Sequence, residues 1–145
     1  MSATLIVGLD GTESGNRALA YAKKLANLIG GCELLVVYVI EWSPYTFQTA
    51  EENSQRHKRR EEEISMAMER VIDPAVTSLK ADGINARGIV RHGDVAELID
   101  AVAVEEKAEQ IIVARSSEGG FVKRVFGTAT ANLVMHASVP VTVVG

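Results

Sequence analysis

Short apolar runs alternate along the chain with longer segments in which apolar residues recur at helical spacing. The runs at residues 4–9 and 34–40 are continuous, which is typical of strands buried on both faces. Further strands are predicted at 86–90, 110–114 and 139–144. The run at 86–90 is shorter and more polar, so we expect it at an edge of the sheet.

The first helical segment follows the first strand and ends at a pair of glycines. Ser14 is expected to cap its N-terminus, and Gly30 and Gly31 are expected to end it. The residues that face inward at helical spacing are Ala18, Leu19, Ala22, Leu25, Ala26 and Ile29.

One long helix is predicted from about Ala50 to Ala81. Its first half is rich in charged residues and should be mostly solvated, whereas its second half carries an apolar face that should dock on the sheet. Pro74 predicts either a kink in this helix or the start of a new turn.

Two shorter helices are predicted in the second half of the chain. Residues 92–94 form a turn, after which Asp94 and Glu97 fit a capping box. Thr128 is expected to open the last helix, which leads into the final strand.

Five strands that alternate with helices predict an α/β fold, an open five-stranded parallel sheet with helices on both faces. The 145 residues suit a single domain, 1–145. In such sheets ligands bind beyond the carboxyl ends of the strands, where the winding reverses. If the first and fourth strands are neighbours there, Asp10 and the loop 114–117 share one crevice.

Composition narrows the functional classes. The net charge of −4 argues against a nucleic-acid partner, and no basic amphipathic segment suggests a membrane anchor. No apolar run approaches the roughly 20 residues of a membrane-spanning helix. The first residues lead straight into a strand, so we expect no signal peptide, and the one cysteine excludes an internal disulfide. A cytoplasmic location is expected.

The loop after the fourth strand is the best phosphate-binding candidate. Ser116 and Ser117 supply donors, and Gly127 and Thr128 are expected at a helix start, where backbone N–H groups are free and the helix dipole favours an anion. The alternative for the last pair is an ordinary helix cap. Arg115 lies inside the same loop and could also meet a phosphate.

Other residues at strand ends could bind the rest of a nucleotide. Asp10 could accept a hydrogen bond from a ribose hydroxyl or an adenine amino group, or it could cap the following helix, and Thr12 suits either role. Val39 and Val113 could sandwich a flat base, or they could simply belong to the core.

Motifs for fast chemistry are missing from the sequence. It contains neither the P-loop pattern nor the dinucleotide-binding Gly-x-Gly-x-x-Gly after the first strand. No set of nucleophile, base and orienting residue stands out, and His57, His92 and His136 have no ligand spacing, so no metal site is predicted. A nucleotide could be bound here without rapid turnover.

Several separated segments resemble the universal stress protein family, over essentially the whole chain. These segments are 6–14, 93–99, the pair Gly127-Thr128, and 136–141. The resemblance implies an open five-stranded α/β domain of the Rossmann-like, adenine nucleotide alpha hydrolase-like type, a homodimer and, in one branch, ATP binding.

The ATP-binding branch carries Gly-x-x-Gly, nine residues, then Gly-Ser/Thr. Gly127-Thr128 matches the last pair, whereas Ala114 and Ser117 replace the two earlier glycines. Where the backbone has positive φ, such a replacement costs about 1–2 kcal/mol, or roughly tenfold or more in affinity. The expected nucleotide-binding residues are Gly8, Leu9, Asp10, Thr12, Val39, Val113, Ala114, Arg115, Ser117, Gly127, Thr128 and Ala129.

The resemblance therefore implies a stress-response sensor or regulator that binds ATP, or ADP or AMP, with or without Mg²⁺. The terminal strand is apolar and no lysine guards it, so we expect a homodimer through Val141 and Val143, and a regulatory protein partner of unknown identity. Two alternatives stay open. One is a family member that no longer binds nucleotide and works through protein contacts. The other is a slow ATPase or self-phosphorylating protein with Ser116, Ser117 or Thr128 as acceptor.

Overall fold

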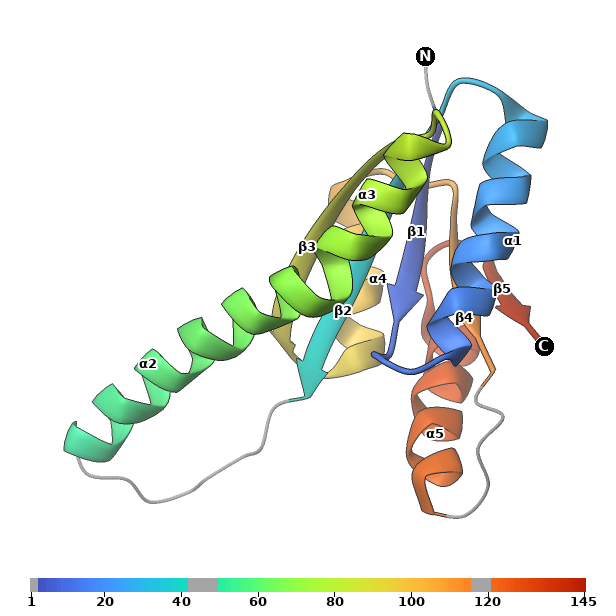
Figure 1. The fold of residues 1–145 in the computed structure, drawn as a ribbon. Coiled ribbons are helices and arrows are strands. Elements are labelled where there is room, and N and C mark those ends of the chain that lie inside the picture. The colour runs from blue at the N-terminus through green and yellow to red at the C-terminus, as the bar shows by residue number, and fades with distance from the viewer. Residues whose placement is uncertain (1–2, 42–49, 116–120) are drawn as a thin grey trace.

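A single parallel sheet of five strands forms the centre of the protein (Figure 1). The computed structural model describes residues 3–41, 50–115 and 121–145, and within them the side chains of all but 50–57 and 121–128. The strands lie in the order β3-β2-β1-β4-β5 and every neighbouring pair is parallel. Their bounds are β1 Ala3–Leu9, β2 Cys32–Glu41, β3 Asn85–Gly93, β4 Gln110–Ala114 and β5 Val141–Val144. The predicted open α/β sheet is confirmed, with β3 at one edge.

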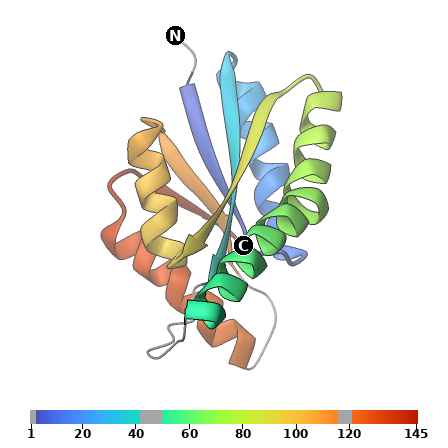
Figure 2. The same cartoon turned by 90° about the vertical axis from the view of Figure 1, so that its left-hand side faces the viewer.

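Helices cover both faces of this sheet, as predicted (Figure 2). One face carries α1 (Ser14–Ile29) and a continuous helical segment made of α2 (Ala50–Ala67), the π-helix η1 (Met68–Ile72) and α3 (Asp73–Ala81). The other face carries α4 (Val95–Glu105) and α5 (Phe121–His136).

The central strands are continuously apolar because each of their faces meets a helical layer. In β1, Leu5 and Val7 pack into the cluster under α1, whereas Ile6 packs into the cluster under α4 and α5. All three are fully buried. On α1, Ala18 and Ala22 are also fully buried, so small side chains let this helix lie close to the sheet.

The long helical segment has the predicted bounds and contains the predicted break. Pro74 stands in the first turn of α3, where its missing N–H removes no necessary hydrogen bond, so the expectation of a new turn is confirmed. The break itself is η1, in which the N–H of Asp73 bonds to the carbonyl of Met68, five residues earlier. Ile72 on η1 is fully buried against Gly88. A Cβ added at Gly88 would lie 2.1 Å from Cγ2 of Ile72.

Four boundaries differ from the sequence predictions. Ser14 is the buried first residue of α1 rather than its cap, and no side-chain cap bond is made at Glu13. β3 continues through Gly93, so the predicted turn at 92–94 is shorter. β5 begins at Val141 rather than at residue 139. Finally, α5 begins at Phe121 and not at Thr128.

Asp94 caps α4, which confirms one of the two bonds of the predicted capping box. Asp94 lies outside the helix in extended conformation, and its carboxylate accepts a hydrogen bond from the N–H of Glu97 at 3.0 Å. The bond fixes the start of α4 directly beyond the end of β3.

Candidate functional site

The winding of the sheet reverses between β1 and β4. The chain passes from β1 to β2 and β3 on one side, then returns to place β4 on the other side of β1. β1 and β4 are hydrogen-bonded neighbours, with Ile6 opposite Ile111 and Val7 opposite Ile112. The predicted adjacency of the first and fourth strands is therefore confirmed, and their carboxyl ends meet where ligands bind in such sheets.

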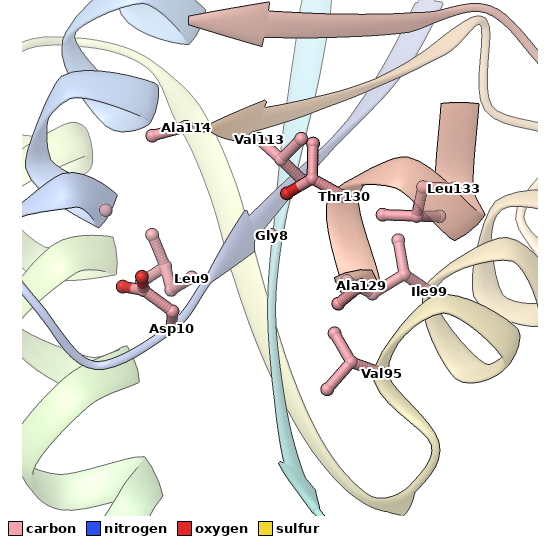
Figure 3. Close-up of a pocket in the computed structure, with 11 residues that line it drawn as sticks. Gly8, Leu9, Asp10, Val95, Ile99, Val113, Ala114, Ala129, Thr130 and Leu133 are labelled. Atoms are coloured by element: carbon pink, nitrogen blue, oxygen red, sulfur yellow. The ribbon is translucent and has the colours of Figure 1, made fainter. Parts of the chain in front are cut away.

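A pocket lies at this junction (Figure 3). Its lining comes from the ends of β1 and β4, the start of α1, and the inner faces of α4 and α5: Gly8, Leu9, Asp10, Gly15, Val95, Ile99, Val113, Ala114, Ala129, Thr130 and Leu133. Its volume is about 40 Å³, which holds ordered water rather than a whole nucleotide. A nucleotide bound here would extend out of the pocket.

Gly8 sets the distance between the pocket walls. A Cβ at this position would lie 3.0 Å from Val113 Cγ1 and 3.1 Å from Ile99 Cδ1. Both neighbours are almost fully buried. The glycine therefore lets β1, β4 and α4 close to van der Waals contact, and the resulting wall is apolar.

Asp10 is the charged residue of this lining, and half of its carboxylate is already engaged. Its Oδ1 accepts hydrogen bonds from the backbone N–H of Thr12 at 2.9 Å and from the Thr12 hydroxyl at 2.7 Å. Thr12 Oγ1 in turn accepts from the N–H of Ser14 at 3.3 Å. Asp10 thus stabilises the turn before α1, and it is Thr12 that reaches the first N–H of the helix.

Tyr38 lies beside the same turn, on the face of the sheet that α1 covers. Gly11 has φ +80°, and a Cβ there would lie 3.2 Å from the Tyr38 ring. Burial, followed by the carboxylates of Asp10 and Glu41, raises the pKa of Tyr38 above its ordinary value. The Asp10 carboxylate is therefore close enough to affect the pKa of Tyr38 electrostatically.

Three of the predicted site residues that the structure describes lie in other surroundings. Val39 is buried in the core cluster with Ile99 and does not line the pocket. Of the two roles expected for it, this position fits a core residue. Thr12 faces a different groove and reaches the pocket through Asp10. Arg115 is exposed; its N–H bonds to the carbonyl of Val144 at 2.8 Å. Ser117 lies outside the described residues.

The predicted cradle of free N–H groups at Gly127 and Thr128 is wrong in one physical respect. Both residues lie inside α5, which begins at Phe121, so they do not form a helix N-terminus. Backbone N–H groups in a helix interior are already bonded to carbonyls one turn earlier. Ala129, the next residue, does line the pocket.

Arg17 connects α1 to the end of β4. Its Nη2 donates to the backbone carbonyl of Arg115, and its Nε is buried without a hydrogen-bond partner among the described residues. The contact places α1 against the strand end that carries Ala114. Nothing in the local sequence pattern marks Arg17 for this role.

Five lining residues were missed from the sequence: Gly15, Val95, Ile99, Thr130 and Leu133. The signal that could have found them is helical spacing. Val95 and Ile99 are four residues apart on α4, as are Ala129 and Leu133 on α5, so each pair shares a face. Those faces cover the β1–β4 junction.

The described lining of the pocket is mostly apolar. Within the described lining, the polar side chains are those of Asp10 and Thr130, and the other side chains are apolar. Such a surface suits the flat face of a base or a sugar edge, with one carboxylate to accept a hydrogen bond. Separately, none of the helices in the described ranges is both long and apolar enough to span a membrane.

Solved structures with the same fold carry the family name. A universal stress protein, UspA, from Lactobacillus plantarum is similar with 17% identity and a TM-score of 0.81, covering 99% of this chain and 97% of that one. A universal stress protein in complex with cAMP has 19% identity and a TM-score of 0.63, covering 99% and 96%. A family member from Arabidopsis thaliana with AMP bound has 16% identity and a TM-score of 0.64, covering 98% and 90%.

The TM-scores of these structures show a shared fold, and the family is shown by a separate comparison with family models. No curated protein matches the chain. The model of the universal stress protein family matches residues 1–145. With its parallel sheet, its β1–β4 crevice and this match along its whole length, the chain belongs to the universal stress protein family.

Proposed function

We propose that the protein binds an adenine nucleotide in the β1–β4 crevice and acts as a stress-response sensor or regulator. The observation that carries the proposal is the convergence of Asp10, Gly8 and Val113 at the point where the winding reverses. The AMP and cAMP complexes of similar structures support adenine as the base.

The wall around Gly8 would hold the base or the sugar. Val113 and Ile99 supply apolar surface, and the missing Cβ of Gly8 lets both of these side chains pack against the β1 backbone. The Asp10 carboxylate retains acceptor capacity beyond its two bonds to Thr12, so it could accept from a ribose hydroxyl or the adenine amino group.

The phosphates would extend towards α5 and the residues after Ala114. Thr130 lines the pocket with its hydroxyl group, and Gly127, Thr128 and Ala129 belong to the same helix. When ATP or ADP is the ligand, Mg²⁺ would be bound chiefly by the phosphates themselves. The described lining holds no side-chain nucleophile next to a general base. Hydrolysis of a bound nucleotide should therefore be slow at most.

The proposed assembly is a homodimer formed through β5. This strand lies at the edge of the sheet, and Val143 is 39% exposed there. Val134 and Met135 on α5 are also exposed, which adds apolar surface for a second copy. Pairing across a two-fold axis would cover the edge that Val141 and Val143 present.

A second candidate function is a regulator that works through protein contacts without nucleotide. The specific observation in its favour is the pocket volume of about 40 Å³, together with Ala114 in place of a motif glycine. Discrimination requires a direct binding measurement.

The decisive experiment measures nucleotide directly. The purified protein is denatured and its supernatant is analysed for adenine by ion-exchange chromatography, and fresh protein is titrated calorimetrically with ATP, ADP, AMP and cAMP, with and without Mg²⁺. Asp10→Asn and Gly127→Glu should weaken or abolish binding while the fold and dimer stay intact. Asp73→Asn, an exposed carboxylate on α3, is the control. Absence of nucleotide in both assays favours the second candidate.

A further inference from the structure

A second and much larger cavity lies on the opposite face of the sheet, between α1 and the η1–α3 segment. Its volume is about 430 Å³, within the range of ordinary small-molecule sites. Apolar surface comes from Leu9, Leu19 and Val71 among others, and the polar side chains of the lining are those of Thr12, Glu13, Asn16, Arg70 and Ser78. We call this cavity the α1–α3 groove.

The π-helix builds one wall of this groove. Arg70 and Val71 belong to η1, and Pro74 and Ala75 follow at the start of α3. η1 is held in place because Ile72 is fully buried against Gly88. Single π-turns inside α-helices are frequent at functional sites, because the extra residue re-aims its neighbours. Here the neighbours so aimed line a cavity.

The groove lining carries one cation, Arg70 on η1, and one carboxylate, Glu13 directly before α1, so an anion is favoured only at the Arg70 end. The side chain of Arg70 is exposed, and its guanidinium makes no hydrogen bond or ion pair within the described part of the chain. By contrast, Lys23 is paired with Asp82, and Arg87 contacts two carboxylates. A free guanidinium beside apolar surface matches a carboxylate, which it can hold through two parallel hydrogen bonds.

We infer that the α1–α3 groove is a binding site for a small amphipathic monocarboxylate. Its carboxylate pairs with Arg70, and its apolar body lies on Leu19, Val71 and Ala75. The groove is separate from the crevice, since Val113, Ala114 and the α4 and α5 residues line only the crevice. The inference does not depend on nucleotide binding.

The two cavities nevertheless meet at one turn. Leu9 and Gly15 line both of them, and Thr12 lines the groove while it bonds to Asp10 in the crevice. A ligand in the groove would therefore contact the turn that orients Asp10.

Phenylacetate is a suitable probe, with phenylacetamide as its uncharged match. Titration into ¹⁵N-labelled full-length protein should give saturable shifts at amides of Asn16, Val71 and Ala75, with a dissociation constant on the order of 1 mM. Phenylacetamide should bind about tenfold more weakly, because it lacks the charge that Arg70 recognises.

Three variants separate specific binding from general electrostatics. Arg70→Gln should weaken phenylacetate about tenfold and leave phenylacetamide unchanged. Lys80→Gln removes one positive charge from α3 outside the groove lining and should change neither. Ala75→Phe should fill the groove and block both probes, and the amide spectrum of each variant checks its fold.

Several results would overturn the inference. It fails if phenylacetate gives no saturable shifts in the groove, or if Lys80→Gln weakens binding as much as Arg70→Gln. The groove is not a separate site if AMP competes with phenylacetate and if Arg70→Gln weakens the binding of AMP as much as that of phenylacetate. Nucleotide binding that survives Arg70→Gln, with no phenylacetate binding, would refute the groove site alone.

Discussion

The hydroxyl of Thr12 donates to Oδ1 of Asp10 over 2.7 Å, and the backbone N–H of Thr12 donates to the same oxygen over 2.9 Å. Both bonds are made to a charged acceptor two residues earlier, so they close a tight turn between β1 and α1. The orientation of the one carboxylate in the crevice lining therefore depends on the residue that also faces the α1–α3 groove.

Thr12→Val should lower the free energy of unfolding by about 1–3 kcal/mol, because it removes a hydroxyl bond to a carboxylate. Thr12→Ser keeps the hydroxyl and should lose much less. Urea denaturation of both variants measures the difference. Equal stabilities for the valine and serine variants would mean that the hydroxyl bond contributes nothing.

Gly8→Ala should destabilise the protein by about 1–3 kcal/mol through overpacking, because the new methyl group lies 3.0 Å from Val113 Cγ1. Val113→Ala removes that carbon, so the double variant should recover part of the loss relative to the sum of the single variants. Additive losses in a double-mutant cycle would show that the strain lies elsewhere.

Tyr38 should ionise at higher pH than an ordinary tyrosine, mainly because of burial and secondly because of Asp10 and Glu41. The difference in tyrosinate absorbance between the parent protein and Tyr38→Phe gives its titration curve. Asp10→Asn should lower the pKa only in part, since burial is the larger cause.

The same shift has a consequence for stability. Folded Tyr38 holds its proton more tightly than the unfolded chain does, so its contribution is complete below the unfolded pKa of about 10 and is lost as the pH rises through the folded value. Tyr38→Phe should therefore show a smaller fall in melting temperature across that alkaline range. An identical fall in both proteins would contradict the raised pKa.

Gly127→Ala should raise the free energy of unfolding by about 0.5–1 kcal/mol, because Gly127 lies inside α5 and alanine is the better helix former. If Gly127 instead stood in a turn with positive φ, the same change would destabilise the protein. Thermal unfolding of this one variant distinguishes the two positions.

The sequence was sufficient for the sheet, for the long helix and for the meeting of Asp10 with Ala114. These features follow from apolar periodicity and from the rule that places ligands where the winding reverses. The predicted start of α5 is wrong because that prediction treats Gly127 as a helix boundary. A single glycine costs a helix only about 1 kcal/mol, which the rest of a long helix can outweigh.

The features that escaped prediction depend on contacts between distant residues. The π-turn is linked to the packing of Ile72 on Gly88, and Arg17 on α1 donates to the carbonyl of Arg115, directly after β4. Ser14 was mistaken for the cap because Thr12, two residues earlier, supplies the acceptor instead. None of these contacts produces a periodic pattern of apolar residues in the sequence.

The π-helix also fixes the length of the chain between residues 68 and 72. Each residue of a helix turns the following ones by about 100°. The π-turn accommodates its extra residue within a single turn, so Ile64 before it and Ile72 at its end both pack against the core. A one-residue deletion in this segment should thus restore a regular helix with α2 and α3 nearly in phase, and its main effect should fall on the groove wall that Arg70 and Val71 form.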